Sequence, residues 1–406
     1  MNTVDIRSAP DAEFIQAIRR RFPVEREIDR VLSRKLAGRS GPGYTAIPLE
    51  TLIEGTRKLI RSQIGDGFIL GNPRWLQGGA SKLQMAFDLE WNGPEGSGGG
   101  ERRVTPMVLR MEPPEAIVET SRKREFEILK LMRGVVPVPP CYWIDAEGEH
   151  LPYPALVYGF AEGVTKPQAR PSQQVSGIGT NFGPQLRSVL ADQFVSALAA
   201  IHTIDATRLA TLAEFEPAKV GSNASVLRQI NWWRRVWEED RPEDVPLVDV
   251  ATRWLIANAP PLDHVSVVHG DFRAGNFLFS EKDQRITAWL DWELAVLGDR
   301  HQDLTWTTGA HFGHYAEDGK TFLASGLLPA EELFRRYEKA SGLPVDPARL
   351  KYYRIMNDFM STVHMLATAW RVANHGKTHQ DVVVAWIAMI GNVIVGKLRD
   401  SLEEVL

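Results

Sequence analysis

The chain has 406 residues, of which 44% are hydrophobic and 24% are charged, and its formal net charge is −4 at pH 7. This composition is ordinary for a folded protein of two or three compact units. The slight negative charge offers no basic surface for general binding of nucleic acid. Cys141 is the only cysteine, which excludes an internal disulfide and a cysteine-based zinc site and favours a reducing cytoplasm.

Neither end of the sequence predicts contact with a membrane. Residues 1–21 mix charges throughout and lack the apolar centre of a signal peptide. The longest apolar run, from Val382 to Gly396, contains Asn392 and is shorter than a membrane span. We expect a buried C-terminal helix there.

The first part of the chain is predicted to be helical. Residues 11–36 and 49–64 carry apolar side chains at helical spacing among many charged ones. They indicate an N-terminal helical extension over residues 1–70. The sequence leaves open whether this extension covers another part of the same chain or forms the surface of a homodimer.

A strand pattern begins at Trp75, and a short glycine-containing segment precedes its first alternating run. Gly78, Gly79 and Ser81 lie just before the strand expected at residues 83–89. Glycines in this position let backbone amides approach a phosphate closely, although a simple β-turn explains them equally well. The richer glycine run at residues 93–100 predicts a hairpin tip.

The following segments divide the remaining chain into two units. A strand at 104–111, a helix at 118–132 and strands at 141–144 and 155–160 predict a mainly β unit over residues 71–160. Residues 161–406 are predicted to be mainly helical. Apolar residues at helical spacing predict helices over 186–202, 331–341, 350–373 and 382–398.

Three polar side chains lie at strand ends between residues 265 and 291. Residues 265–268 predict a buried strand, and residues 277–290 predict a hairpin. A four-residue turn would pair residue 280 with 285 and residue 276 with 289. Asp271, Asn276 and Asp291 would then gather at one end of the hairpin, with Asp291 about 7 Å from Asn276.

These three side chains suit phosphoryl transfer. The reaction needs a carboxylate that receives the proton of the attacking hydroxyl, and oxygen ligands that hold Mg²⁺ against the phosphates. Asp271 is placed for the first task, and Asn276 and Asp291 are placed for the second. The alternative is a hairpin in which Asp and Asn merely cap turns.

The motifs in this region resemble the aminoglycoside phosphotransferase and choline kinase family, small-molecule relatives of the protein kinases. They are His269-Gly270-Asp271 with Asn276, Leu290-Asp291-Trp292-Glu293, Gly298-Asp299 and Asp303-Leu304. Only six residues separate Asp291 from Gly298, which leaves no room for a kinase activation segment and favours a small-molecule substrate. The resemblance covers roughly residues 71–375.

The resemblance implies an α+β, two-lobed protein-kinase-like fold that binds ATP and Mg²⁺. Arg110 occupies the place of the usual phosphate-binding lysine, and Glu125 falls where the family's helix carboxylate pairs with that residue. Tyr158 and Phe160 lie in a stretch that is similar to the hinge whose backbone binds the nucleotide base. Asp299 and Asp303 are expected to brace the catalytic loop, and His202 and His269 to be structural.

The predicted function is ATP- and Mg²⁺-dependent phosphorylation of a hydroxyl group on a small molecule, in the cytoplasm, without nucleic acid or membrane as partner. Residues 292–406 carry 14 acidic against 12 basic side chains, too even a balance for a polycationic aminoglycoside. The apolar series from Met356 to Trp370, the following Arg371, and Lys166 and Arg170 in the loop expected at 164–185 favour an apolar or acidic hydroxy metabolite. A nucleotide-binding pseudokinase, a metal-dependent phosphohydrolase and a true aminoglycoside phosphotransferase remain the alternatives.

Overall fold

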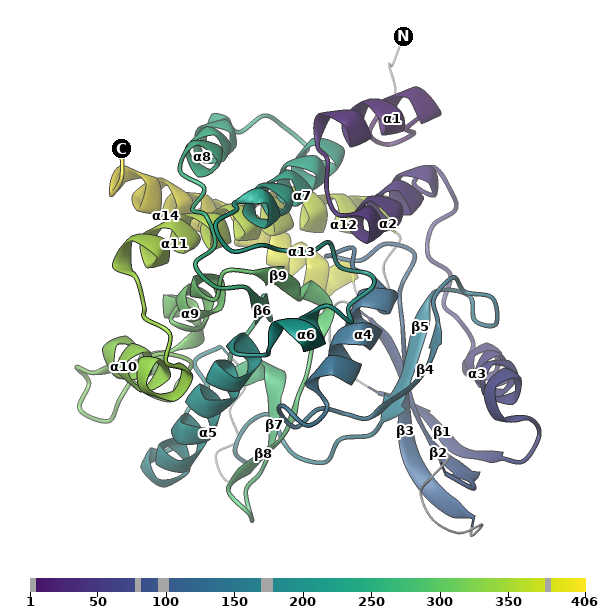
Figure 1. Cartoon of the computed structure of the whole chain (residues 1–406). Helices are drawn as coiled ribbons and strands as arrows, with labels where there is room; N and C mark the ends of the chain where they lie inside the picture. Colours follow the sequence, from purple (N-terminus) through teal and green to yellow (C-terminus); the bar gives the residue numbers. More distant parts are fainter. Residues whose placement is uncertain (1–4, 77–81, 94–101, 169–177, 377–380) are drawn as a thin grey trace.

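The computed structural model describes residues 5–76, 82–93, 102–168, 178–376 and 381–406. It has a small β lobe and a larger helical lobe, with helix α4 (Arg122–Met132) between them (Figure 1). Gly78, Gly79 and Ser81, the candidate phosphate-loop residues, lie outside the described residues. The division at residues 70 and 160 stays a prediction.

The β lobe is built on one antiparallel sheet with the strand order β1-β2-β3-β5-β4. The strands are β1 (Ile69–Trp75), β2 (Leu83–Trp91), β3 (Arg103–Met111), β4 (Cys141–Asp145) and β5 (Ala155–Gly159). β2 and β3 pair over their whole lengths, from Leu83 opposite Met111 to Trp91 opposite Arg103. This long ladder fixes which side chains of β3 face the helical lobe.

Strand β1 begins at Ile69, so the start of the strand pattern predicted at Trp75 was wrong. Asn72 has a positive φ of 49°, and the pairing with β2 is irregular between Gly71 and Arg74. Pro73 lies in this interruption, where a strand at the edge of a sheet can accept a proline. The Asn72-Pro73 pair interrupts the alternating pattern, so the sequence did not predict this strand.

Helices from the N-terminal extension pack on both lobes. Helix α3 (Leu49–Ile64) lies beside the sheet (Figure 1), and its Leu52, Leu59 and Ile60 belong to the apolar core of the β lobe. Helices α1 (Ala12–Arg21) and α2 (Arg26–Ala37) contact α7 (Ala224–Asp240) of the helical lobe. The extension therefore covers other parts of its own chain.

Helix α2 forms ion pairs and hydrogen bonds to both lobes. Toward the β lobe, Arg34 pairs with Glu112 at 2.7 Å, and Glu27 accepts a hydrogen bond from Ser121, the N-cap residue of α4, at 2.5 Å. Toward the helical lobe, Lys35 pairs with Glu239 of α7 at 3.0 Å. All but one of these side chains are almost fully buried, and Arg34 is 37% exposed.

The helical lobe contains more helices than the sequence predicted. Its helices after α4 are α5 (Pro184–His202), α6 (Ala206–Leu209), α7, α8 (Pro246–Ala257), α9 (His301–Thr307), α10 (Ala330–Ser341), α11 (Pro347–Thr362), α12 (Ala369–His375), α13 (Asp381–Met389) and α14 (Gly391–Glu403). No helix was predicted where α7 and α8 lie. None of the helices in the described residues combines the length and apolar character needed to cross a bilayer.

Two long helices that the sequence predicted differ in the structure. The helix expected over residues 350–373 contains a π-helical segment, Val363–Thr368, between α11 and α12. The helix expected over 382–398 is divided at Ile390 into α13 and α14. At this division Gly391 packs against Leu366, where a Cβ atom would lie only 2.5 Å from the leucine side chain.

Candidate active site

The loop that carries Asp271 is held by hydrogen bonds from its backbone to one buried carboxylate. The N–H groups of His269 and Gly270 donate to Asp303, at 2.6 and 2.9 Å. Gly270 has a positive φ of 82°, and a Cβ atom there would lie 2.8 Å from the Cβ of Leu294. The close approach and the backbone angle both require glycine. The expected bracing role of Asp303 is confirmed.

The neighbouring histidines take structural positions, as predicted. His202 is fully buried, contacts the Tyr337 hydroxyl through Nδ1 at 2.9 Å, and contacts Asp303 through Nε2 at 3.2 Å. Burial lowers the pKa of His202, although Asp303 opposes the shift. The Nε2 atom of the buried His269 lies 3.0 Å from the Leu290 carbonyl oxygen.

The prediction for Asp299 was wrong. Its carboxylate accepts a hydrogen bond from the backbone of His301, contacts that residue's imidazole at 2.6 Å, and pairs with Arg349. It therefore stabilises the start of α9 and its contact with α11, and in the described structure it makes no hydrogen bond to the catalytic loop.

Asp271 is held by three donors. Its Oδ1 accepts hydrogen bonds from Trp306 Nε1 at 2.6 Å and Arg273 Nε at 2.8 Å. Its Oδ2 accepts one from Asn276 Nδ2 at 2.6 Å. The carboxylate is thus fixed in orientation, yet its side chain remains 16% exposed and its oxygens retain lone pairs for an incoming hydroxyl.

The hairpin after this loop consists of β7 (Phe277–Ser280) and β8 (Arg285–Trp289), and its register differs from the prediction. Residue 280 does face 285, but the pairing shifts between Leu278 and Phe279, so that residue 277, not residue 276, faces 289. The extra residue in β8 is an irregularity that a simple turn count cannot reveal.

The irregular hairpin still brings Asn276 and Asp291 together. Leu290 donates its N–H to the Asn276 carbonyl at 2.8 Å, directly before Asp291. Asp291 itself has left-handed backbone angles, φ 64° and ψ 50°. This uncommon conformation for a residue with a side chain is typical of functional positions.

The donor atoms of this pair fit Mg²⁺. Asn276 makes its contacts to Asp271 through Nδ2, so its amide oxygen accepts no hydrogen bond from the described residues. Asp291 uses Oδ1 for an ion pair with Arg110, which leaves Oδ2 available as a second oxygen donor. No group of three or more His, Cys, Asp and Glu side chains suited to a metal occurs among the described residues. Two oxygen donors suit Mg²⁺, which takes its other ligands from water and phosphates.

Arg110 lies at the centre of a buried cluster of charges between the lobes. Its guanidinium is 3.3 Å from Glu125, 2.6 Å from Asp291 and 3.3 Å from Glu293. The Arg110 side chain is 8% exposed. Burial alone would lower the pKa of Arg110, but the three carboxylates outweigh it and raise that pKa. The structure thus contains the expected Arg110–Glu125 pair and adds Asp291 to it.

Glu293 was assigned no role from the sequence, although it stands two residues after Asp291. It pairs with Lys82 at 3.1 Å, with Arg122 at 3.0 Å and with Arg110 at 3.3 Å. Burial would raise the pKa of Glu293, but these three cations hold it well below its ordinary value. Lys82, which directly follows the glycine-containing segment, was also missed. The position of Glu293 in the Asp-Trp-Glu motif was the available signal.

Tyr158 and Phe160, the predicted hinge residues, differ in what they can offer a nucleotide base. The phenol of Tyr158 lies near Arg110, and burial raises its pKa to about 12, so it stays protonated. Phe160 donates its backbone N–H to Pro106 at 2.9 Å and exposes 39% of its surface. Phe160 therefore has its ring and carbonyl, not its N–H, available for a base.

Trp306 is a third side chain at the site that the sequence did not reveal. It comes from α9, three residues after Asp303, so one helical turn separates the residue that braces the loop from the residue that contacts Asp271. Tryptophan is abundant in this chain, and nothing distinguishes Trp306 from the core tryptophans by sequence alone.

Comparison with curated proteins finds relatives that are much longer than this chain. Human acyl-CoA dehydrogenase family member 11 is 27% identical over 252 residues, which are 58% of this chain and 30% of that protein. Mouse acyl-CoA dehydrogenase family member 10 is 25% identical over 250 residues, 59% of this chain and 22% of that protein. The chain thus spans less than a third of the length of these relatives.

Solved structures share the fold. A Ralstonia eutropha protein assigned as an aminoglycoside phosphotransferase has a TM-score of 0.59 at 20% identity, with 87% of this chain and 98% of that chain covered. Macrolide 2′-phosphotransferase type I has a TM-score of 0.52 at 18% identity, with 85% and 99% covered. These similarities confirm the predicted α+β kinase-like fold.

The family model agrees with the motifs and the fold. The model described as the phosphotransferase enzyme family, APH, matches residues 97–353, which include the catalytic loop, the hairpin and Asp303. That span is well over half of the chain. This protein is a member of the phosphotransferase enzyme family.

Proposed function

We propose that the protein transfers a phosphoryl group from ATP to a hydroxyl group of a small molecule, with Mg²⁺ as cofactor. The observation that carries this proposal is the arrangement around Asp271. The carboxylate of Asp271 accepts a hydrogen bond from Asn276, and the backbone of Asn276 pairs with Leu290, directly before Asp291. Asp291 in turn pairs with the buried Arg110. Phosphoryl transfer is catalysed mainly by such positioning and by charges around the phosphates.

Each side chain has a task in this reaction. Asp271 orients the acceptor hydroxyl and takes its proton, while Trp306, Arg273 and Asn276 hold the carboxylate in place. Asn276 and Asp291 would hold Mg²⁺, which supplies positive charge against the phosphate oxygens. Arg110, positioned by Glu125 and Glu293, would contact the phosphates.

Nucleotide use is supported by the structural neighbours. One of them, APH(2″)-IIIa, was solved as a complex with GDP and kanamycin, and it has a TM-score of 0.51 to this chain at 13% identity. We propose ATP as the donor, with Tyr158 and Phe160 beside the base. We also propose a cytoplasmic location, on the strength of the single cysteine.

We propose a hydroxylated apolar or acidic metabolite, such as a hydroxy acid or its acyl thioester, as the acceptor. The even charge balance of residues 292–406 supports this class over a polycation. The names of the relatives, acyl-CoA dehydrogenases, point to the same chemistry. The test is ADP release with Mg-ATP against a panel of hydroxy acids, their thioesters and kanamycin-type compounds. Efficient turnover of the aminoglycosides alone would overturn the acceptor class.

A nucleotide-binding pseudokinase is the second candidate, because Arg110 replaces the usual lysine and pairs with Asp291. In such a protein the ion pair would persist when nucleotide binds. The same panel separates the two functions, since a pseudokinase binds Mg-ATP and releases no ADP with any acceptor.

Replacing Asp291 with alanine should lower the affinity for Mg-ATP by at least about tenfold, because one charged metal ligand is lost. Isothermal titration with Mg-ATP measures this change. The control is Asp283→Asn, in the exposed turn of the same hairpin, which should bind like the wild type. Unchanged affinity in Asp291→Ala would remove Asp291 from the metal site.

Replacing Arg110 with alanine should raise the KM for ATP and lower kcat together, by about tenfold each, because the phosphates lose a buried positive charge. Arg110→Lys keeps the charge and should retain much more of the activity. Steady-state kinetics with varied ATP measures both changes. Wild-type kinetics in Arg110→Ala would mean that another cation, such as Lys82, contacts the phosphates.

A further inference from the structure

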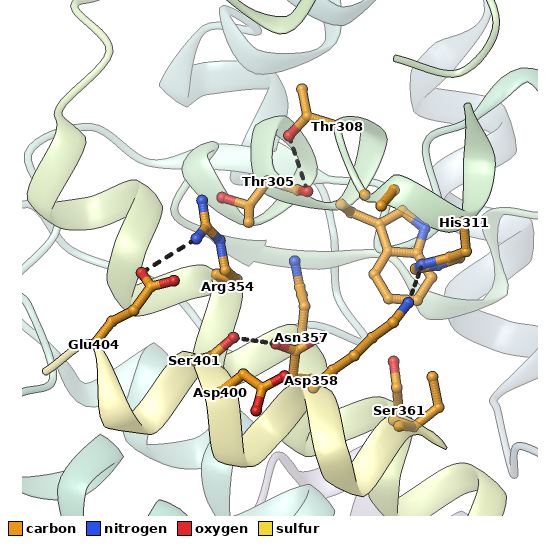
Figure 2. Close-up of a pocket in the computed structure, with 15 residues that line it drawn as sticks. Thr305, Thr308, His311, Arg354, Asn357, Asp358, Ser361, Asp400, Ser401 and Glu404 are labelled. Atoms are coloured by element: carbon orange, nitrogen blue, oxygen red, sulfur yellow. Dashed lines mark hydrogen bonds and ion pairs between the residues drawn. The ribbon is translucent and has the colours of Figure 1, made fainter. Parts of the chain in front are cut away.

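A cavity in the helical lobe lies beside Asp271. It has a volume of about 380 Å³, within the range of small-molecule sites. Figure 2 shows its walls: Thr305 and Thr308 stand on one side, and Arg354, Asn357 and Ser401 stand opposite. The walls come from α9 and the short turn after it, from α11 and from α14.

Trp306 links this cavity to the catalytic carboxylate. Its side chain lines the cavity, and its Nε1 donates to Asp271 Oδ1 at 2.6 Å. The ring of His311, also in the wall, meets the indole edge-on with 5.9 Å between centroids. A molecule in the cavity therefore lies against the side chain that donates to Asp271.

The carboxylates that line the cavity already have partners. Asp358 accepts a hydrogen bond from Ser401 at 2.7 Å, and burial raises the pKa of Asp358. Glu404 pairs with Arg354 at 3.4 Å, as the dashed line in Figure 2 marks. Asp400 pairs with Arg399 at 2.6 Å. Each of these three carboxylates thus already has a hydrogen-bond or ion-pair partner.

Lys397 differs from these residues because its partner carries no negative charge. Its Nζ lies 3.4 Å from Nδ1 of His311, and across the described residues it makes no ion pair with a carboxylate. Burial, with Lys397 and Arg273 nearby, lowers the pKa of His311 to about 4, so the imidazole is neutral at neutral pH. The charge of Lys397 reaches Asp358 only at longer range.

We propose that this cavity binds the acceptor and that Lys397 receives an anionic group of that molecule, in the first instance a carboxylate. The proposal rests on the proposed function, which it deepens by naming a residue that selects the acceptor. A carboxylate at Lys397 would gain a charge-assisted hydrogen bond. An ammonium group in the same place would face Lys397 and would be repelled.

The test uses β-hydroxyhexanoate, its uncharged methyl ester and the amino alcohol of the same chain length as probes. Binding of each to the full chain with Mg-ADP is measured by calorimetry, and phosphorylation with Mg-ATP is measured separately. Lys397→Ala should weaken binding of the acid about tenfold or more and change binding of the ester less than about twofold. Lys397→Arg should restore binding of the acid.

The matched control is Lys351→Ala, an exposed lysine on α11 that should behave as the wild type. Equal effects of Lys397→Ala on acid and ester, no binding of the acid to the wild type, or tighter binding of the amino alcohol would each overturn the proposal. If the acid binds through Lys397 but is never phosphorylated, the anion site stands and the proposed function fails. If it is phosphorylated equally well by Lys397→Ala, the function stands and the anion site fails.

Discussion

Asp271→Asn is expected to bind Mg-ATP almost normally and to lose phosphoryl transfer by about a hundredfold or more. The amide cannot accept the proton of the acceptor hydroxyl. It also meets Trp306 Nε1, Arg273 Nε and Asn276 Nδ2, all of which are donors, so its own NH₂ group faces at least one of them. Both effects act on kcat, whereas Asp291, a proposed metal ligand, and Arg110 do not contact Asp271 and remain in place.

Single-turnover kinetics, followed by the formation of the phosphorylated acceptor, measures the loss of phosphoryl transfer. A calorimetric titration of Mg-ATP measures the retained nucleotide binding. Asp283→Asn is the control, because this carboxylate lies in the exposed turn of the hairpin and accepts a hydrogen bond from Ser280. Near-normal turnover in Asp271→Asn would remove Asp271 from the mechanism.

Glu293→Gln should lower the free energy of unfolding at neutral pH by about 3 kcal/mol, the scale for removing one partner from a buried group of charges. Lys82, Arg110 and Arg122 all lie within 3.3 Å of this carboxylate. Glutamine keeps the size of the side chain and removes the negative charge, so three buried cations lose a shared partner. Chemical denaturation measures the difference.

The penalty should depend on pH in a defined direction. Folding lowers the pKa of Glu293 from its ordinary value of 4.5. The stabilising contribution of the carboxylate is therefore complete at pH values above 4.5, the pKa of the unfolded state. The contribution is lost as the pH falls further toward the folded-state pKa. The difference between wild type and Glu293→Gln should therefore shrink in acid. Glu50→Gln, at an exposed position, should show no such difference, and an equal penalty at all pH values would contradict the assignment.

Much of the fold followed from the sequence because its strands and several of its helices have regular apolar patterns. The strand over residues 104–111 and helix α3 appear close to where periodicity placed them. Errors arose where local chemistry interrupts a pattern. Pro73 hides the edge strand β1, and Gly391 divides the last apolar run because Leu366 packs against it.

The site was predictable to the extent that its residues are close in sequence. Asp271, Asn276 and Asp291 belong to one loop and hairpin, so a count of residues brought them near each other despite the shifted register. Lys82 and Trp306 reach the site from distant elements. Lys82, just before β2, pairs with Glu293, and Trp306 of α9 donates to Asp271; no pattern within their own segments encodes these contacts.

Helix α2 has a mechanical consequence for the enzyme. Rotation of one lobe against the other about the hinge near residue 160 would pull Arg34 from Glu112 or Lys35 from Glu239. Separating a buried ion pair such as Lys35–Glu239 costs about 3–5 kcal/mol, and the Glu27–Ser121 hydrogen bond would resist the same motion. Helix α2 therefore opposes rotation of the β lobe relative to the helical lobe. We therefore expect the separation of the two lobes to change little when Mg-ATP binds.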